Sequence, residues 1–283
     1  MVALLLAAGS ALIWGAGDFC GGKATQRAAA LPVALLSQIV ALPVLVLCVL
    51  LTTTTAPSPG DLLVGAVAGC AGFIGIVLLY RGLAAGAMAI FAPVTAVTAA
   101  VVPLGVGLIL DEPPGALALL GVGCAISAIA LMSLTPPVGG GRVAVRAGRG
   151  LLGLALAAGA MFGVFFAVLG QTSGQDAGLW PLVGVRIGSV GLGLALFARS
   201  GASLRLSGTV LRWTVAAGVF DITANALYVL AVQRGLLSIV APIAALYPAS
   251  TVLLALVVDR ERIRPVQAAG LGLAATALVL VAT

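Results

Sequence analysis

Two stretches of the sequence resemble each other, IFAPVTAVTAA at Ile90–Ala100 and IVAPIAALYPA at Ile239–Ala249. They align when the sequence is shifted by 149 residues, and the alignment runs on from Ile90 to Ser133 with twelve identities in forty-four positions. The matched residues include a proline, a glutamate and two glycines in each copy, which an apolar composition alone does not explain. The sequence therefore predicts an internal duplication.

The chain around these stretches is too apolar for a soluble protein. Of its 283 residues, 62% are hydrophobic and 8% are charged, whereas about a quarter of the residues in a soluble domain are charged. A membrane-spanning helix needs about 20 mostly apolar residues, and such windows recur along the whole chain. The composition predicts an all-α integral membrane protein.

Hydropathy and helix-breaking residues divide the chain into two sets of five spans. Residues 135–142 form the one clear linker, with two prolines and a run of glycines before the first arginine. We therefore expect a first repeat at 1–134, a basic cytoplasmic linker at 135–149 and a second repeat at 150–283. The ten expected transmembrane helices lie near residues 2–20, 31–52, 61–83, 87–109, 115–134, 150–170, 179–198, 213–233, 236–258 and 265–282.

The basic residues are distributed unevenly between the two sides of these spans. The loops after the odd-numbered spans hold twelve Lys and Arg residues, while the other loops and the termini hold only Arg234. Positively charged loops remain in the cytoplasm, so we expect both termini outside the cell membrane. Because each repeat has an odd number of spans, the two repeats must run in opposite directions. Inverted repeats are typical of alternating-access transporters.

Several other classes of partner are disfavoured by the composition. The net charge of +6 comes from bases scattered between apolar runs, which indicates membrane topology and not nucleic-acid binding. Histidine is absent, and the four cysteines have no paired spacing, so we expect no metal and no cofactor. The expected partners are a small-molecule substrate and membrane lipid.

Three charged residues lie inside the predicted spans, where charge is costly and marks functional or pairing sites. Asp221 lies nearest the membrane midplane, with Arg186 somewhat beyond it and Asp18 closer to the cytoplasmic surface. Asp221 and Arg186 are candidates for ion coupling or for a charge pair that locks two helices together. Asp18 is a third candidate for this group, and its alternative is an interfacial ion pair with Lys23.

Helical spacing groups the polar residues into faces. Asp221, Asn225 and Tyr228 are four and three residues apart and share one helix face, as do Trp14 and Asp18 on the first span. We expect such faces to point into a central cavity. The residues predicted to line it are Trp14, Arg186, Asn225, Tyr228 and Tyr247.

Prolines interrupt corresponding spans of the two halves. Pro93 in the first half aligns with Pro242 in the second, and Pro248 follows it. A proline removes one helical hydrogen bond, and paired breaks in two repeats indicate the binding region of a carrier. A kink that serves only packing is the alternative for each proline.

Paired glycines suggest where helices pack closely. Gly121 and Gly123 align with Gly270 and Gly272 in the last span of each half. Small residues allow helices to approach, so we expect helix packing at these positions, with a homodimer face as the second interpretation.

The repeated arrangement resembles the EamA-type drug/metabolite transporter superfamily. The resemblance rests on Trp14-Gly15, on the Ala-Pro pair in the fourth span of each half and on the glutamates of LDEP and DRER that follow. It covers essentially the whole chain, although Trp14-Gly15 has only Phe162-Gly163 as its counterpart. It implies a non-enzymatic ten-helix carrier of amino acids, metabolites, sugars or drugs. We therefore expect a secondary carrier or exporter of a small metabolite or drug, with proton coupling through Asp221 as a hypothesis.

Two other functions remain open from the sequence. Gly15-Ala16-Gly17-Asp18 matches the GxGD motif of intramembrane aspartyl proteases, and Asp221 supplies a second carboxylate. The motif is short, however, and the order of the two motifs is reversed relative to those proteases. A non-transporting scaffold or receptor is the other alternative. Charges near the midplane favour a transport pathway over it.

Overall fold

The protein is described here from a computed structural model that covers residues 1–52, 56–84, 95–96, 98–103, 105–106, 115–133, 148–172, 177–247, 250, 254 and 265–282. Within this part of the chain the regular structure is helical throughout. A backbone in a bilayer must satisfy its hydrogen bonds internally, and a helix does so within one segment. The helices are α1 Val2–Thr25, α2 Ala30–Thr52, α3 Pro59–Ala84, α5 Ala116–Ser133, α6 Gly148–Leu169, α7 Trp180–Ser200, α8 Gly208–Val232, α9 Leu237–Ala244 and α11 Pro265–Ala282.

Six of these helices are long and apolar enough to cross a membrane, namely α1, α2, α3, α6, α7 and α8. A shorter apolar segment, Leu119–Ala128, lies within α5. The prediction of an all-helical, multi-pass membrane protein is confirmed. Of the expected span at 87–109 the structure describes only residues 95–96, 98–103 and 105–106, and of that at 236–258 it describes residues 236–247, 250 and 254, so the count of ten remains a prediction.

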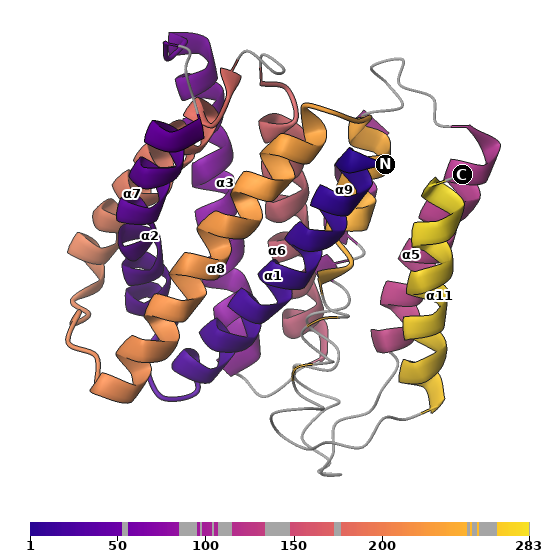
Figure 1. Ribbon diagram of the computed structural model, residues 1–283. Helices are drawn as coiled ribbons and strands as arrows, with labels where there is room; N and C mark the ends of the chain where they lie inside the picture. The colour runs from indigo at the N-terminus through magenta and orange to yellow at the C-terminus, as the bar shows by residue number, and fades with distance from the viewer. Residues whose placement is uncertain are drawn as a thin grey trace.

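The helices pack in a pattern that repeats when the two halves are exchanged. Helix α1 packs along α8, and its counterpart α6 packs along α3. Helix α2 contacts α7, and α5 packs against α11 beside the main group of helices (Figure 1). Exchange of the halves therefore maps the α1–α8 pair onto the α6–α3 pair. The duplication seen in the sequence is present in the packing.

Glycines bring α3 and α7 into backbone contact. Gly65 and Gly69 of α3 lie against the main chain of α7, and Gly184 and Gly188 of α7 lie against the main chain of α3. A Cβ atom added at any of the four would collide with a carbonyl oxygen of the opposite helix. Small residues four apart on facing helices are a common means of close membrane packing.

The glycines predicted to mediate packing behave differently. Gly123 of α5 and Gly272 of α11 are exposed, and a Cβ atom added at either would meet no other atom within 4 Å. The prediction of close packing at these two positions is therefore wrong, because they lie on the outer faces of their helices. Gly121 and Gly270 are buried. The homodimer face remains a prediction.

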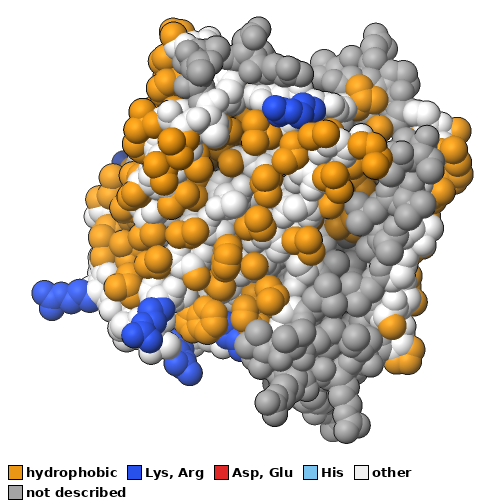
Figure 2. Space-filling view, viewed as in Figure 1, with side chains coloured by type: hydrophobic (Ala, Val, Ile, Leu, Met, Phe, Trp, Pro, Cys, Tyr) orange, Lys and Arg blue, Asp and Glu red, His pale blue; other side chains and the backbone are white. Residues whose placement is uncertain are grey.

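The surface carries apolar side chains between two ends that carry basic ones. Large hydrophobic side chains are exposed along α1, α2 and α7, and Figure 2 shows them over the middle of one face with Lys and Arg at its lower and upper edges. The N-terminus and the C-terminus lie at the same end of the molecule (Figure 1). The Asp111–Glu112 loop, residues 134–147 and the arginines at 260–264 lie outside the described residues.

Candidate functional site

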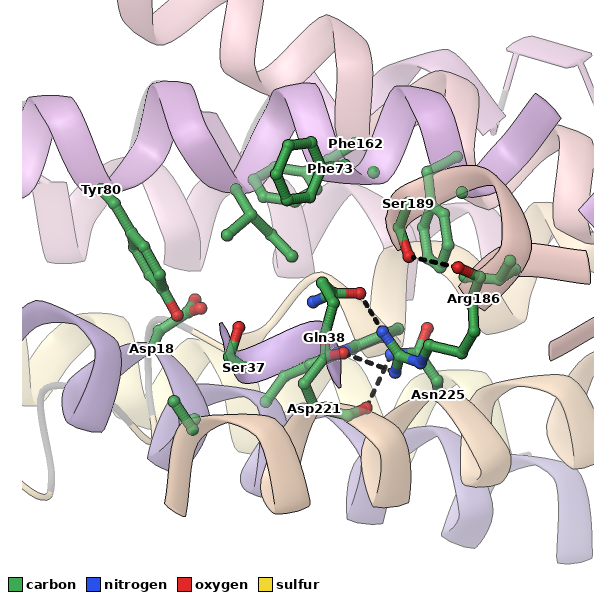
Figure 3. Close-up of a pocket in the computed structure, with 18 of the residues that line it drawn as sticks. Asp18, Ser37, Gln38, Phe73, Tyr80, Phe162, Arg186, Ser189, Asp221 and Asn225 are labelled. Carbon is green, nitrogen blue, oxygen red and sulfur yellow. Dashed lines mark hydrogen bonds and ion pairs between the residues drawn. The ribbon is translucent and has the colours of Figure 1, made fainter. Parts of the chain in front are cut away.

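A cavity lies among α1, α2, α3, α6, α7 and α8, where the two halves meet. Its polar side chains come mainly from α1, α2, α7 and α8, while α3 and α6 contribute mostly glycines and phenylalanines. Figure 3 shows Arg186, Gln38, Asp221 and Asn225 gathered at one end and Asp18 with Tyr80 at the other. The cavity therefore has two polar ends joined by an apolar wall.

Arg186 is the centre of the first polar end. Its Nη2 lies 2.7 Å from Asp221 Oδ2, and its Nη1 donates a hydrogen bond to Gln38 Oε1. The Arg186 side chain is 2% exposed and that of Asp221 is 18% exposed. A buried cation needs an opposite charge and further hydrogen bonds, and Arg186 obtains them from two other helices. It links α7 to both α8 and α2.

Not every polar atom at this end has a partner. Arg186 Nε, Gln38 Nε2 and Asn225 Oδ1 are buried and make no hydrogen bond within the described part of the chain. The Asn225 amide group itself donates to the main-chain oxygen of Asp221 over 2.6 Å. Buried polar atoms are almost always hydrogen-bonded, so two spare donors and one spare acceptor beside a cavity indicate a place where a polar ligand can bind.

Asp18 occupies the second polar end. It lines the cavity from α1, and the Tyr80 hydroxyl of α3 lies beside its carboxylate (Figure 3). Gly21, almost one turn further along α1, makes room for that ring, because a Cβ atom there would collide with the Tyr80 hydroxyl. Lys23, the alternative partner expected from the sequence, lies with its Nζ 5.2 Å from the centre of the Phe19 ring.

Aromatic rings form the wall between the two ends. Trp14 contacts Phe165 at a ring-centre distance of 6.5 Å and Phe166 at 5.2 Å. Phe73 and Phe162 also line the cavity. Aromatic rings provide a large apolar surface and can also attract cations at their faces. The wall therefore suits the apolar body of an organic molecule.

The structure brings most of the residues singled out in the sequence to this one cavity. Four of the five expected lining residues, Trp14, Arg186, Asn225 and Tyr247, line it together with Asp18 and Asp221. Tyr228 does not. It is fully buried behind Trp14, with ring centres 5.7 Å apart, and its hydroxyl donates to the main-chain oxygen of Phe166 over 3.0 Å.

The predicted helix breaks are only partly within the described residues. Pro242 lies inside α9, which ends two residues later at Ala244, and Tyr247 reaches the cavity just beyond that end. Pro242 itself is buried and does not line the cavity. Pro93 and Pro248 lie outside the described residues.

Sequence reasoning missed several lining residues, and for one of them a signal existed. Gln38 and its neighbour Ser37 are the only polar residues of α2 before Thr52. An isolated amide in an apolar span indicates an inward-facing position. Phe162 also had a signal, because it is the counterpart of Trp14 in the second half. Phe73 and Phe165 had none, because a phenylalanine facing lipid and one facing a cavity look alike in the sequence.

Comparisons with known proteins agree with this architecture. The model of the EamA-like transporter family matches residues 1–134 and again residues 150–283. No curated protein matches the chain. A solved structure titled only "Crystal structure of protein" is similar, with a TM-score of 0.73 and 16% identity over 98% of this chain and 95% of that one.

The two family matches cover almost all of the sequence, and they are offset by the same shift of 149 residues that aligns the halves. The similar solved structure has low identity and supports the fold alone. Together with the apolar helices and their repeated packing, the matches show what kind of protein this is. The chain belongs to the EamA-like transporter family, and it is a multi-pass membrane protein of the drug/metabolite transporter type.

Proposed function

We propose that the chain is a secondary carrier that moves a small organic molecule across the cell membrane by alternating access to this cavity. The observation that carries the proposal is the cavity itself, which lies between the two repeats and has spare buried hydrogen-bonding atoms beside an aromatic wall. Alternating exposure of a site between inverted repeats is a common transport mechanism. With the basic loops in the cytoplasm, both termini face outward.

The Arg186–Asp221 pair is proposed as the coupling element. A substrate acceptor group such as a carboxylate competes with Asp221 for the guanidinium, whose Nε is already available. Protonation of Asp221 weakens the ion pair and frees Arg186 for the substrate. Asp18 faces the same cavity and Arg186 is its only cationic lining residue within the described part of the chain, so these three groups determine its charge.

The alternative functions have less support. An aspartyl protease needs two carboxylates that share a proton, but Asp221 is paired with Arg186 in this structure. A scaffold has no need of spare buried hydrogen-bonding atoms, and a receptor, which could use them, has no need of the inverted repeats on which alternating access depends. The main alternative role for Arg186 and Asp221 is purely structural, as an ion pair that holds α7 and α8 together.

Transport can be tested with the purified chain in sealed proteoliposomes. Two radiolabelled probes suit the cavity, because phenylalanine and 3-phenylpropionate both join a carboxylate to an aromatic ring. We expect at least one probe to exchange across the membrane in a counterflow assay, and we expect an imposed pH gradient to change its rate. Absence of exchange for both probes by correctly folded protein would contradict the proposal.

A further inference from the structure

Among the described residues that line the cavity, Asp18 is the one charged group without an oppositely charged partner. Asp221 is paired with Arg186, and within the described residues no Lys or Arg forms an ion pair with Asp18. Lys23 lies over the Phe19 ring. A carboxylate within a membrane protein is stable only when a cation, a proton or water compensates its charge. The Asp18 end of the cavity therefore needs a cation, a proton or water to compensate the carboxylate.

The surroundings of Asp18 favour an organic cation. Tyr80 places its hydroxyl beside the carboxylate (Figure 3), and Tyr247 lines the same cavity. Trp14 and Phe73 also line the cavity, and the faces of aromatic rings attract ammonium groups. A metal ion fits less well, because the described residues contain no cluster of three or more His, Cys, Asp or Glu side chains.

A ligand at this place is also indicated by the opposite end of the cavity. Asn225 and Gln38 are each 2% exposed, and each has a buried polar atom without a partner within the described residues. These atoms can bind the polar groups of a molecule whose apolar body lies against the phenylalanines. A molecule held there extends toward Asp18, since both ends open into the same cavity.

From this geometry we infer that Asp18 forms a binding site for the ammonium group of the substrate, with Tyr80 and the aromatic wall completing it. The site lies in the cavity assigned above to transport and rests on that proposed function. The substrate class is then an organic amine with an apolar body, oriented with its cationic end toward Asp18 and its other polar groups toward Arg186.

Binding to purified protein in detergent tests this inference without measuring transport. The chain has three tryptophans, and Trp14 lines the cavity, so a background with Trp180→Phe and Trp213→Phe makes fluorescence report on the cavity alone. The probes are 2-phenylethylamine, which is cationic at pH 7, and 2-phenylethanol, its neutral analogue. Asp18→Asn should raise the Kd of the amine about tenfold or more, the loss expected for a hydrogen bond to a charged group.

The neutral alcohol serves as the folding control, because its Kd should remain unchanged in the same variant. Asp18→Glu should keep most of the affinity for the amine. Equal weakening of both probes, or undiminished amine binding by Asp18→Asn, would overturn the assignment. Amine binding without any flux would support the Asp18 site and contradict the carrier function. Flux that does not depend on Asp18 would support the carrier function and contradict the Asp18 site.

Discussion

The α1–α8 and α3–α6 pairs occupy equivalent places in the two-fold arrangement, but their chemistry differs. The shift of 149 residues that relates the halves pairs Asp221 of α8 with Gly72 of α3. The part of α6 that corresponds to the Asp18 turn of α1, Phe165–Ala167, carries no charge. Where α8 presents a carboxylate to the cavity, α3 presents a glycine covered by the Phe165 ring, which lies 2.9 Å from where a Cβ atom would be. Among the described residues that line the cavity, the α1–α8 pair contributes two carboxylates, and the α3–α6 pair contributes no charged side chain.

The difference separates the helix packing that the two pairs share from the side chains in which they differ. The shared helix packing provides a symmetrical frame, as alternating access requires. Among the described residues that line the cavity, the charged ones come from α1, α7 and α8, where Arg186 of α7 compensates Asp221. In the same part of the chain α3 and α6 line the cavity with no cation, so uncharged side chains are the stable choice there. A substrate in the cavity therefore contacts one polar and one apolar wall.

The largest expected effect comes from making the two pairs alike. Gly72→Asp places a carboxylate at the position equivalent to Asp221, but against the Phe165 ring and in a cavity whose Arg186 is already paired with Asp221. Overpacking costs about 1–3 kcal/mol and an unpaired intramembrane charge about 3 kcal/mol. We expect the variant to be strongly destabilised in thermal unfolding in detergent. Gly72→Ala is the matched control, and comparable stability of the two variants would contradict the account.

Removal of the compensating cation should have the next largest effect. Arg186→Gln leaves Asp221 and Gln38 without their partner, and breaking a buried pair in this way costs about 3–5 kcal/mol. The double variant Arg186→Gln/Asp221→Asn should recover much of that loss, because the uncompensated charge is gone. Thermal unfolding of the single and double variants measures both effects. A double variant no more stable than Arg186→Gln would show that the charge is not the cause.

A smaller effect should follow when the link between the two walls is cut. Tyr228 of α8 donates a hydrogen bond to the Phe166 main chain of α6, so Tyr228→Phe removes a contact between the walls while keeping the ring. We expect a loss of about 1 kcal/mol in the free energy of unfolding. Thr223→Val is the control, because Thr223 bonds only within its own helix, to the Val219 carbonyl. Equal losses in the two variants would argue against a specific link.

The sequence predicted the fold further than it predicted the site, for physical reasons. Membrane helices follow from hydropathy, and the duplication from matched prolines and glycines, because both are properties of the chain alone. Charged residues could be placed in the cavity because their burial in lipid is costly. Tyr228 was misplaced because a helix face is broad, and a residue at its edge can turn toward a neighbouring helix. The glycines of α3 and α7 could not be told from the chain's other glycines, because their contacts form only when the helices meet.

The proposed coupling of protons to substrate movement by the Arg186–Asp221 pair is tested most directly by Asp221→Asn. Asparagine keeps the size of the side chain and can still accept a hydrogen bond from Arg186, but it cannot exchange a proton at neutral pH. The measurement compares uptake of radiolabelled phenylalanine or 3-phenylpropionate, whichever the native protein carries, by proteoliposomes with and without a pH gradient. We expect Asp221→Asn to lose the gradient-driven component while exchange at equal pH continues. Undiminished gradient-driven uptake by folded Asp221→Asn protein would contradict the coupling role and leave the pair as a structural lock between α7 and α8.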